Sequence, residues 1–409
     1  MGIKLGLVGL GSFGSVFAPL FASHPLVDSI ALCDAEESKL QKFVEHPVTA
    51  KKLDKNCVFT SFDDICQSDC DALAIITQPS LHAPQCIQAM ESGKDVYSAV
   101  PVICLPDDDE MMEWCHKIIE ATKRTGKNYM LGETTIFRPQ TMFCSRMARQ
   151  GLFGDFVFAE AEYAHDLDSG CSLREVRQSR QTGKIGSQLG DAMQKYYDRG
   201  FKNHPMAYPT HSVSGVVEVM RSKPVKVSAY GYRNANHDPY FANSDFSNIT
   251  AFFQMDNGAA FRVAEYREIS ANIGLEGEDF RIFGTRGSYS CNDWRNNGRT
   301  EPTPEKKPNV SKKLTDAEMF DPLPREVADA YNMALNKDAK PGDDFVPQGH
   351  GGSHPYLVHE FVTSVAEQRR PFIPIEKAAT YMAMGVAAHK SAQRDGELVK
   401  VEDFGKLWN

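Results

Sequence analysis

Two short motifs in the middle of the sequence combine a tyrosine with a histidine. Tyr163 and His165 are separated by one residue, and Tyr208 and His211 by two. In an extended segment, residues two apart point to the same face, so Tyr163 and His165 would share one face. A tight turn over 208–211 would bring the second pair together. Phenol and imidazole groups placed in this way can remove a proton from a carbon next to a carbonyl group.

Each motif also has an ordinary structural interpretation. Tyr163 and His165 alternate with other residue types, as they would on the polar face of an edge strand. His165, Asp166 and His211 could be combined into a metal site, but the sequence has no helical H-E-x-x-H motif or third spaced ligand to complete one. We therefore predict proton-transfer chemistry and no bound metal.

The clearest binding motif lies at the N-terminus. An apolar run, residues 3–8, has the length of a buried strand and is followed directly by Gly9, Gly11 and Gly14 in G-x-G-x-x-G spacing. The first glycine of such a motif allows a tight turn, the second lets the backbone approach a pyrophosphate, and the third permits close helix–strand packing. Residues 15–21 suit the helix whose free N–H groups would face the phosphates.

An acid follows the motif at an informative distance. A second apolar run, residues 30–33, ends on Asp34, which lies 20 residues after Gly14. This spacing places a carboxylate where the 2′-hydroxyl of an NAD ribose would lie. A carboxylate would repel the additional phosphate of NADP, so the expected cofactor is NAD. The uncharged segment 5–21 is expected to form this strand and helix rather than a signal sequence.

Further candidate cofactor-binding residues follow the other strands predicted in the N-terminal third, over 72–77, 95–98 and 129–131. Ligands of open α/β sheets bind at the carboxyl ends of strands. Together with two residues of the glycine motif, the candidates are Ser12, Phe13, Thr77, Gln78, Pro79, His82, Ala99, Val100, Pro101 and Glu133. The alternation of strands and helices predicts a doubly wound parallel sheet, a Rossmann domain, over residues 1–133.

Beyond this point the pattern is that of an antiparallel-rich sheet. Residues 249–255 and 259–266 flank an Asp-Asn-Gly hairpin signal. We expect an α/β domain with a large open sheet over 134–409, which would carry the substrate and the contacts between subunits. Two closing helices, over 355–368 and 376–394, would complete the chain.

Other segments of the second domain have structural interpretations. Residues 301–313 contain three prolines and are expected to form an exposed loop. Arg262, Glu265 and Arg267 on a predicted strand are interpreted as cross-strand ion pairs. Alternating apolar residues could line either the core or a subunit interface: Ile249, Ala251, Phe253 and Met255.

With these motifs in this order, the sequence resembles the Gfo/Idh/MocA oxidoreductases. In that family an N-terminal Rossmann domain precedes an α/β domain whose open sheet carries the substrate. The resemblance extends over essentially the whole chain, and the family's Thr-Pro-x-x-x-His turn looks like residues 77–82, with Gln78 inserted. It implies an NAD-dependent oxidoreductase that forms a homo-oligomer, a dimer or a tetramer.

Two positions depart from the dehydrogenases of this family. Those enzymes usually have Glu-Lys-Pro after the fifth strand, with the lysine beside the reacting hydroxyl, where this sequence has Ala99, Val100 and Pro101. They also often have an aspartate four residues before the substrate-domain histidine, where Ala207 precedes His211. The usual polyol-to-ketone mechanism therefore cannot be transferred residue by residue.

The segments 163–167 and 208–211 are similar to motifs of the NAD-dependent α-N-acetylgalactosaminidases, a branch of the same superfamily that tolerates valine before the proline. In that branch NAD is thought to oxidise the sugar transiently at C3, which acidifies the C2 proton. The glycosidic oxygen is eliminated, water adds, and the ketone is reduced again. The branch has glutamate where this sequence has Ala99, and residues 170–205 do not match it.

The resemblance implies roles for the candidate residues. His211 would serve the hydroxyl being oxidised, Tyr163 or His165 would take the adjacent C–H proton, and Tyr208 would position the sugar. Glu133 could orient the nicotinamide or a sugar hydroxyl, or could simply cap a turn. Other expected substrate contacts are Pro209, Thr210 and His354.

Composition sets wider limits on function. The 409 residues have room for two domains, and the net charge of −9 gives no general attraction to nucleic acid or anionic membranes. The ten cysteines lack paired metal-ligand spacing and are interpreted as free thiols of a cytoplasmic protein. Three functions are compatible with the sequence: a sugar or glycoside oxidoreductase, a redox-assisted glycosidase, and a non-catalytic dinucleotide-binding protein.

Overall fold

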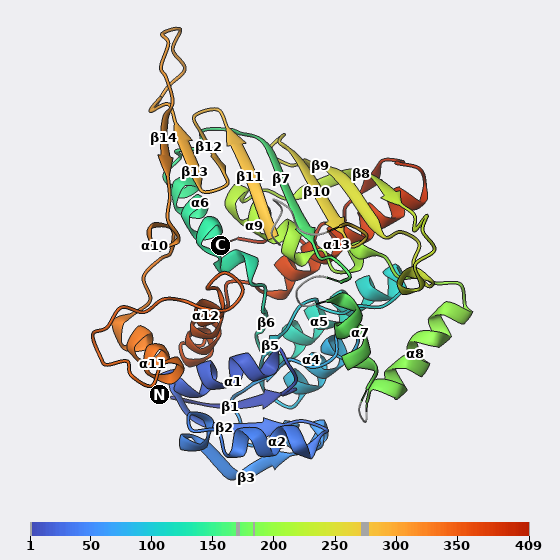
Figure 1. The fold of residues 1–409 in the computed structure, drawn as a ribbon, viewed down its shortest axis with the longest axis vertical. Helices are drawn as coiled ribbons and strands as arrows, with labels where there is room; N and C mark the ends of the chain where they lie inside the picture. The colour runs from blue at the N-terminus through green and yellow to red at the C-terminus, as the bar shows by residue number, and fades with distance from the viewer. Residues whose placement is uncertain (1, 169–171, 183–184, 271–277, 409) are drawn as a thin grey trace. The chain divides into compact units, whose positions relative to one another are not determined.

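The computed structural model describes residues 2–168, 172–182, 185–270 and 278–408 (Figure 1). The chain forms two compact units, each assembled from separate stretches of sequence. The first unit comprises Met1–Thr134, Arg180–Lys195 and Pro322–Ala379. The second comprises Thr135–Ser179, Tyr196–Asp321 and Thr380–Asn409.

The first unit is built on a six-stranded sheet in the order β3-β2-β1-β4-β5-β6. Its strands are β1 (Ile3–Val8), β2 (Val27–Cys33), β3 (Leu53–Phe59), β4 (Ala72–Ile75), β5 (Asp95–Ser98) and β6 (Tyr129–Leu131). All neighbouring pairs are parallel. Every residue of β4 is buried, as expected for a strand covered on both faces. The strand order confirms the predicted doubly wound Rossmann sheet.

Helices from both ends of the sequence pack in this unit. They are α1 (Gly14–Ser23), α2 (Glu37–Val44), α3 (Phe62–Cys66), α4 (His82–Glu91), α5 (Asp108–Thr125), α11 (Arg325–Leu335) and α12 (His354–Ala366). Both α11 and α12 contact α1 (Figure 1). The sequence predicts α12 as a closing helix of the second domain, whereas its packing places it in the first unit.

Helix α5 illustrates how local sequence sets the limits of an element. The side chain of Asp107 caps the helix by accepting hydrogen bonds from the backbone N–H groups of Asp109 and Glu110. Gly126 ends it in the left-handed conformation, at φ 69°. Acidic residues fill the first turn and basic residues the last, which suits the helix dipole.

The second unit is built on a nine-stranded sheet in the order β14-β13-β12-β11-β7-β10-β9-β8-β15. Its strands are β7 (Phe156–Ala164), β8 (Pro224–Tyr232), β9 (Asn248–Met255), β10 (Ala260–Tyr266), β11 (Glu278–Gly284), β12 (Gly287–Ser290), β13 (Asp293–Asn296), β14 (Val310–Lys313) and β15 (Val399–Lys400). Strands β7 and β10 are parallel, and the other neighbouring pairs are antiparallel. The predicted antiparallel-rich sheet is confirmed, with one parallel pair at its centre.

Alternation along β9 separates the two faces of this sheet. Ile249, Ala251, Phe253 and Met255 are buried, so within this chain they belong to the core. Phe252 is 52% exposed on the opposite, open face. Helix α9 (Thr210–Met220) contacts β7, β10 and β11 and packs beside α6 (Pro139–Arg149) (Figure 1).

The segment 301–313 differs in part from the expected loop. Its residues are almost all exposed, but Val310–Lys313 form β14, which pairs with β13 at the edge of the sheet. Backbone pairing with a preformed strand supplies a partner that no side-chain pattern in this polar segment indicates.

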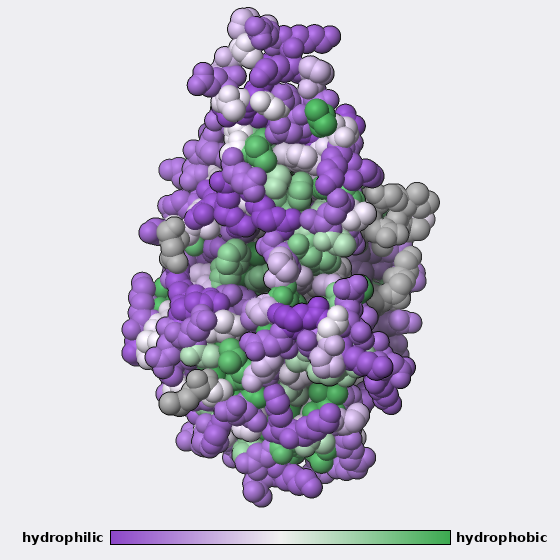
Figure 2. All heavy atoms as spheres, turned by 90° about the vertical axis from the view of Figure 1, so that its left-hand side faces the viewer, coloured by the Kyte–Doolittle hydropathy of each residue, from purple (hydrophilic) through white to green (hydrophobic). Residues whose placement is uncertain are grey.

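The remaining helices are α7 (Leu173–Gln181), α8 (Gly186–Asp198), α10 (Asp316–Met319) and α13 (Ile375–Gln393), with short 3₁₀ turns between elements. Figure 2 shows hydrophilic residues over most of one face, with apolar residues in separate patches. Among the described residues, no helix combines the length and apolar character required for a membrane span.

The glycine motif yields a paired test. A Cβ at Gly14 would overlap the carbonyl oxygen of Gly9, whereas a Cβ at Gly11 would meet no atom within 4 Å. We expect Gly14→Ala to lower the free energy of unfolding by about 1–3 kcal/mol, since the turn and helix must separate. Gly11→Ala should fold normally but bind NAD more weakly, because its methyl group would occupy the side open to the pyrophosphate. Denaturant titration and NAD titration of both variants check this, and equal stabilities would contradict it.

Candidate functional site

The glycine turn of the first unit is shaped to receive a dinucleotide. Gly9 has φ +87°, and a Cβ there would overlap the carbonyl of Ile76. Helix α1 begins directly after Ser12 and Phe13, and no side chain caps its first turn. The unpaired backbone N–H groups of a helix N-terminus bind phosphate. The residues present therefore fit the pyrophosphate of NAD.

Asp34 is fixed at the carboxyl end of β2. Its carboxylate accepts hydrogen bonds from the backbone N–H of Leu10, at 2.7 Å, and of Glu36, at 2.9 Å. Leu10 lies inside the glycine motif, so the acid and the turn are held together. Lys39 lies 3.7 Å away. Carboxylate oxygens accept more than one hydrogen bond each, and Asp34 retains the capacity to bind ribose hydroxyls.

The loops after β4 and β5 are joined by a buried histidine. The Nδ1 atom of His82 lies 2.8 Å from the carbonyl oxygen of Pro101, and its Nε2 atom lies 3.2 Å from that of Thr77. Burial lowers the pKa of His82, which favours the neutral ring. His82, predicted to bind the cofactor, thus holds the loops after β4 and β5 together. Gln78 and Pro79 lie in the first of these loops.

The loop after β5 begins with apolar residues. The backbone N–H of Ala99 donates to the carbonyl of Ile75, and the side chains of Ala99 and Val100 are buried. Val100 occupies the position at which family dehydrogenases carry a lysine. Glu133, which follows β6, is buried as well.

His354 lies beside the glycine turn. Its ring centroid is 4.3 Å from that of Phe17 and 5.7 Å from that of Phe13. Its Nε2 atom is 3.0 Å from Nδ1 of His350. The structure therefore places this predicted substrate residue in the first unit, against α1.

The two tyrosine–histidine motifs come together in the second unit. The Tyr163 hydroxyl lies 2.9 Å from Nδ1 of His165, so the two side chains share one face as expected. Tyr163 lies on β7, the central strand of nine, which excludes the edge-strand interpretation. The His211 ring, in the first turn of α9, lies edge-on to Tyr163 and to Tyr208, with centroids 5.1 Å apart in each case.

The segment 208–211 positions this histidine. A 3₁₀ turn over Pro205–Ala207 precedes it, and Pro209 is the residue before the helix that starts at Thr210. The predicted turn is therefore a helix entry. His211 and Thr210 are buried at that entry.

Two glutamates that the sequence did not mark as site residues flank Tyr163. Glu265 on β10 and Glu278 on β11 are its register partners on the two neighbouring strands. The Glu278 carboxylate pairs with Arg138 at 2.8 Å and accepts from the hydroxyl of Thr135 at 2.7 Å. The same carboxylate lies 3.8 Å from Nδ1 of His211.

Glu265 is interpreted from sequence as part of a cross-strand ion pair, and the structure corrects this. Arg262 does pair across strands, with Glu160 at 2.7 Å. Glu265 instead pairs with Arg267 of its own segment, at 2.6 Å, and accepts a short hydrogen bond from the Ser212 hydroxyl. Full burial raises the pKa of Glu265 to about 7, although Arg267 and Ser212 favour the charged form.

Burial also raises the pKa of the Tyr163 phenol, and the nearby Arg267 guanidinium counteracts part of that rise. The cluster therefore contains, beside the His211 imidazole, a phenol and a carboxyl group whose pKa values are raised by burial and partly lowered again by Arg267. Groups perturbed in this way by their surroundings concentrate at functional sites.

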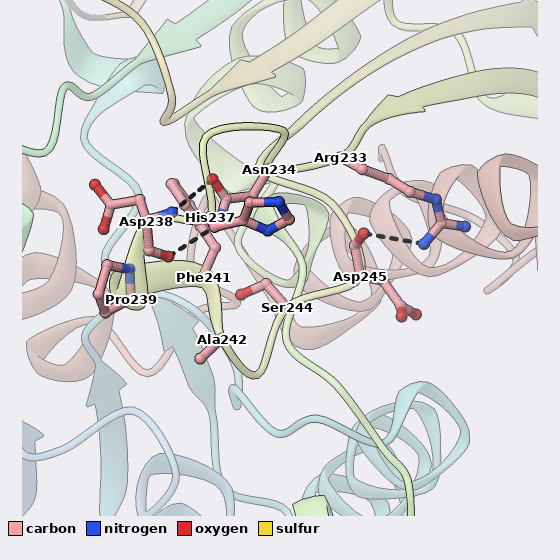
Figure 3. A pocket seen from close by; sticks show the side chains of 9 residues that line it. All are labelled: Arg233, Asn234, His237, Asp238, Pro239, Phe241, Ala242, Ser244 and Asp245. Carbon is pink, nitrogen blue, oxygen red and sulfur yellow. Dashed lines mark hydrogen bonds between the residues drawn. The ribbon is translucent and has the colours of Figure 1, made fainter.

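A separate pocket lies in the connection between β8 and β9. Its volume is about 400 Å³, and it is lined by Arg233, Asn234, His237, Asp238, Pro239, Phe241, Ala242, Ser244 and Asp245 (Figure 3). None of the predicted site residues lines it. Arg174 on α7 pairs with both Asp168 and Asp238, which ties this connection to the segment that follows β7.

Residues 3–133 match a family model, GFO_IDH_MocA, described as "Oxidoreductase family, NAD-binding Rossmann fold". This match confirms the resemblance inferred from the sequence and identifies residues 3–133 as an NAD-binding Rossmann fold of an oxidoreductase family.

The curated relatives that this chain matches carry glycosidase names. Over 223 residues it is 30% identical to an alpha-N-acetylgalactosaminidase of Shewanella oneidensis, and 29% identical to a glycosyl hydrolase family 109 protein of Shewanella baltica. Each alignment covers 53% of this chain and 44% of the relative. The matched part thus spans less than half the length of these relatives.

Solved structures share the fold over the whole chain. Aldose-aldose oxidoreductase from Caulobacter crescentus superposes with a TM-score of 0.66 at 17% identity, covering 98% of this chain and 100% of that one. Levoglucosan dehydrogenase, solved with NADH, gives 0.69 at 15% identity with the same coverage. At these identities the likeness establishes the two-part fold alone.

The acid at the end of β2 can be tested by substitution. Asp34→Ala removes the acceptor for the ribose hydroxyls and the negative charge that opposes a 2′-phosphate. We expect NAD affinity to fall by roughly 10–100-fold, with a smaller loss, or a gain, for NADP. Titration of both dinucleotides by intrinsic fluorescence measures the ratio. An unchanged ratio of the two affinities would contradict the assignment.

The raised pKa of Glu265 predicts how stability depends on pH. Because its pKa lies above the value in the unfolded chain, the folded protein binds the extra proton between about pH 4.5 and 7. The contribution to stability is present at the acid end of this window and is lost as pH rises through about 7, by roughly 1–3 kcal/mol. Denaturant unfolding of the wild type and of Glu265→Gln at several pH values tests this. In the variant, the free energy of unfolding should lack this part of its dependence on pH. The same pH dependence in both proteins would contradict the prediction.

Proposed function

We propose that this protein is an NAD-dependent enzyme that acts on a glycoside, oxidising a ring carbon and reducing it again within one cycle, so that the net reaction cleaves the glycosidic bond. The cluster of Tyr163, Tyr208 and His211 is the observation that carries the proposal, since proton removal from carbon needs such groups. The named activity of the relative from Shewanella oneidensis supports the same class of reaction.

The first unit would hold the cofactor. Gly9, Gly11 and the N-terminus of α1 would bind its pyrophosphate, and Asp34 its ribose. When bound, NAD would supply the acceptor for a hydride from a sugar carbon and the donor that returns it.

The residues of the second unit would move the protons. His211 would take the proton of the hydroxyl being oxidised, and the Glu278 carboxylate, 3.8 Å from Nδ1 of its ring, would orient the imidazole. Tyr163 would take the proton of the adjacent carbon, passing its own proton to His165, with which it is in hydrogen-bond contact. Tyr208, edge-on to His211, would position the sugar.

A plain sugar dehydrogenase is the second candidate function. Structural neighbours with that activity in their names, such as levoglucosan dehydrogenase, favour it. Val100 argues against the usual form of that mechanism, because an apolar side chain stands where a lysine would assist the hydroxyl. A non-catalytic dinucleotide-binding protein would have no need of the cluster around Tyr163.

Aryl glycosides in deuterated water, with NAD below the protein concentration, separate these functions. The proposal predicts many sugars released per NAD, deuterium at C2, and no accumulation of NADH. One NADH per substrate with an intact glycosidic bond would identify a dehydrogenase instead. NAD binding without turnover on any sugar would indicate the non-catalytic alternative.

Substitutions in the cluster complete this test. Tyr163→Phe and His211→Ala should each lower kcat by about 10²–10⁴-fold, the usual loss for a positioned acid or base, while NAD affinity stays unchanged. Tyr230→Phe is the matched control, since that tyrosine is 65% exposed on the open face of the same sheet.

A homo-oligomer in the cytoplasm, a dimer or a tetramer, is part of the proposal. The open face of the nine-stranded sheet exposes Phe252, which supports an interface there. The nine cysteines that the structure describes are free thiols, as in a reducing compartment.

A further inference from the structure

Glu265 lies at the junction of the elements that carry the tyrosine–histidine cluster. It stands directly beside Tyr163 in the parallel register of β10 and β7. Its side chain is fully buried on the inner face of the sheet, under α9. The carboxyl group therefore contacts protein groups alone.

One carboxylate oxygen of Glu265 faces the histidine side of the cluster. Oε1 accepts a short hydrogen bond from the hydroxyl of Ser212, whose oxygen also lies 3.0 Å from the carbonyl oxygen of Pro209. Ser212 follows His211 in the first turn of α9. Through this hydroxyl, Glu265 fixes the helix entry that holds His211 over the sheet.

The other oxygen faces the tyrosine side. Oε2 binds Nη2 of Arg267 at 2.6 Å. Nη1 of the same guanidinium donates to the carbonyl oxygens of Tyr163, at 3.1 Å, and Tyr266, at 3.0 Å. The guanidinium carbon lies 4.7 Å from the centre of the Tyr163 ring. Arg267 thus contacts Tyr163 at its backbone and at its ring, and Glu265 orients Arg267.

We propose that Glu265 is a positioning residue, which acts through Ser212 and Arg267 to fix the Tyr163 phenol relative to the His211 ring. The inference rests on the proposed function, in which these two groups move protons. A buried ion pair is a weak contributor to stability, because desolvation offsets much of its attraction. Its place between two proton-carrying side chains is accounted for by the geometry it imposes.

The same two strands supply a matched control. Glu160 on β7 pairs with Arg262 on β10 at 2.7 Å, in an ion pair that joins the two strands. Alternation along β7 directs Glu160 to the open face, away from Tyr163. Glu160→Gln therefore removes a comparable carboxylate without touching the cluster.

Two measurements test the proposal on the full chain. The first is steady-state kinetics on the aryl glycoside with NAD. The second is carbon-13 NMR of protein labelled at the tyrosine hydroxyl-bearing carbon, in which Tyr163→Phe identifies the Tyr163 signal. We expect Glu265→Gln to lower kcat by about 10²-fold, to leave KM and NAD affinity within about twofold, and to shift the Tyr163 signal. Glu160→Gln should change neither measurement.

The outcomes separate this inference from the proposed function. If Glu265→Gln leaves both kcat and the Tyr163 signal unchanged, or if both variants behave alike, Glu265 has no positioning role. If the wild type turns over no glycoside, the proposed function fails, and the NMR signal alone decides the inference. Should Glu265→Gln not fold, Ser212→Ala removes one hydrogen bond of the network and should shift the same signal, with a loss of about 10-fold in kcat. An unshifted signal in that variant would overturn the proposal.

Discussion

The arrangement of the second unit depends on the pairing of charges buried on the inner face of its sheet. Glu265 and Glu278 stand on either side of Tyr163, and each is compensated by an arginine. A buried carboxylate without such a partner is strongly destabilising. The strands that carry the partners are consequently held in a fixed register, and the helix is held against them. The groups proposed to move protons are therefore positioned by regular secondary structure.

The N-terminal Rossmann sheet could be predicted from sequence because its signals are local. Each signal can be recognised from neighbouring residues: the glycine spacing after β1, the apolar runs of β2 and β4, and the acid at position 34. The pairing of Tyr163 with His165 was predictable for the same reason, since the two-residue period of a strand places both on one face.

The glutamates of the cluster could not be predicted in this way. Glu265 and Glu278 reach Tyr163 through a parallel and an antiparallel register with β7, which is far from both in sequence. The two-residue period of β10 separates Glu265 from Arg262, but it does not indicate which residues of the neighbouring strands lie beside them. Strand β14 was missed for a related reason, because it is defined by the backbone of its neighbour rather than by its own side chains.

The packing of α12 on the glycine-turn helix has a consequence for biosynthesis. Phe17 and Phe21 of α1 rest on His354 and Phe361, which come far later in the sequence. All six strands of the first sheet are synthesised before α12, and the aromatic side chains of α1 lack these two partners until α12 follows. A sheet whose strands come early in the sequence thus completes its packing only after a long intervening segment has been made, and the nascent chain exposes part of this aromatic surface in the meantime.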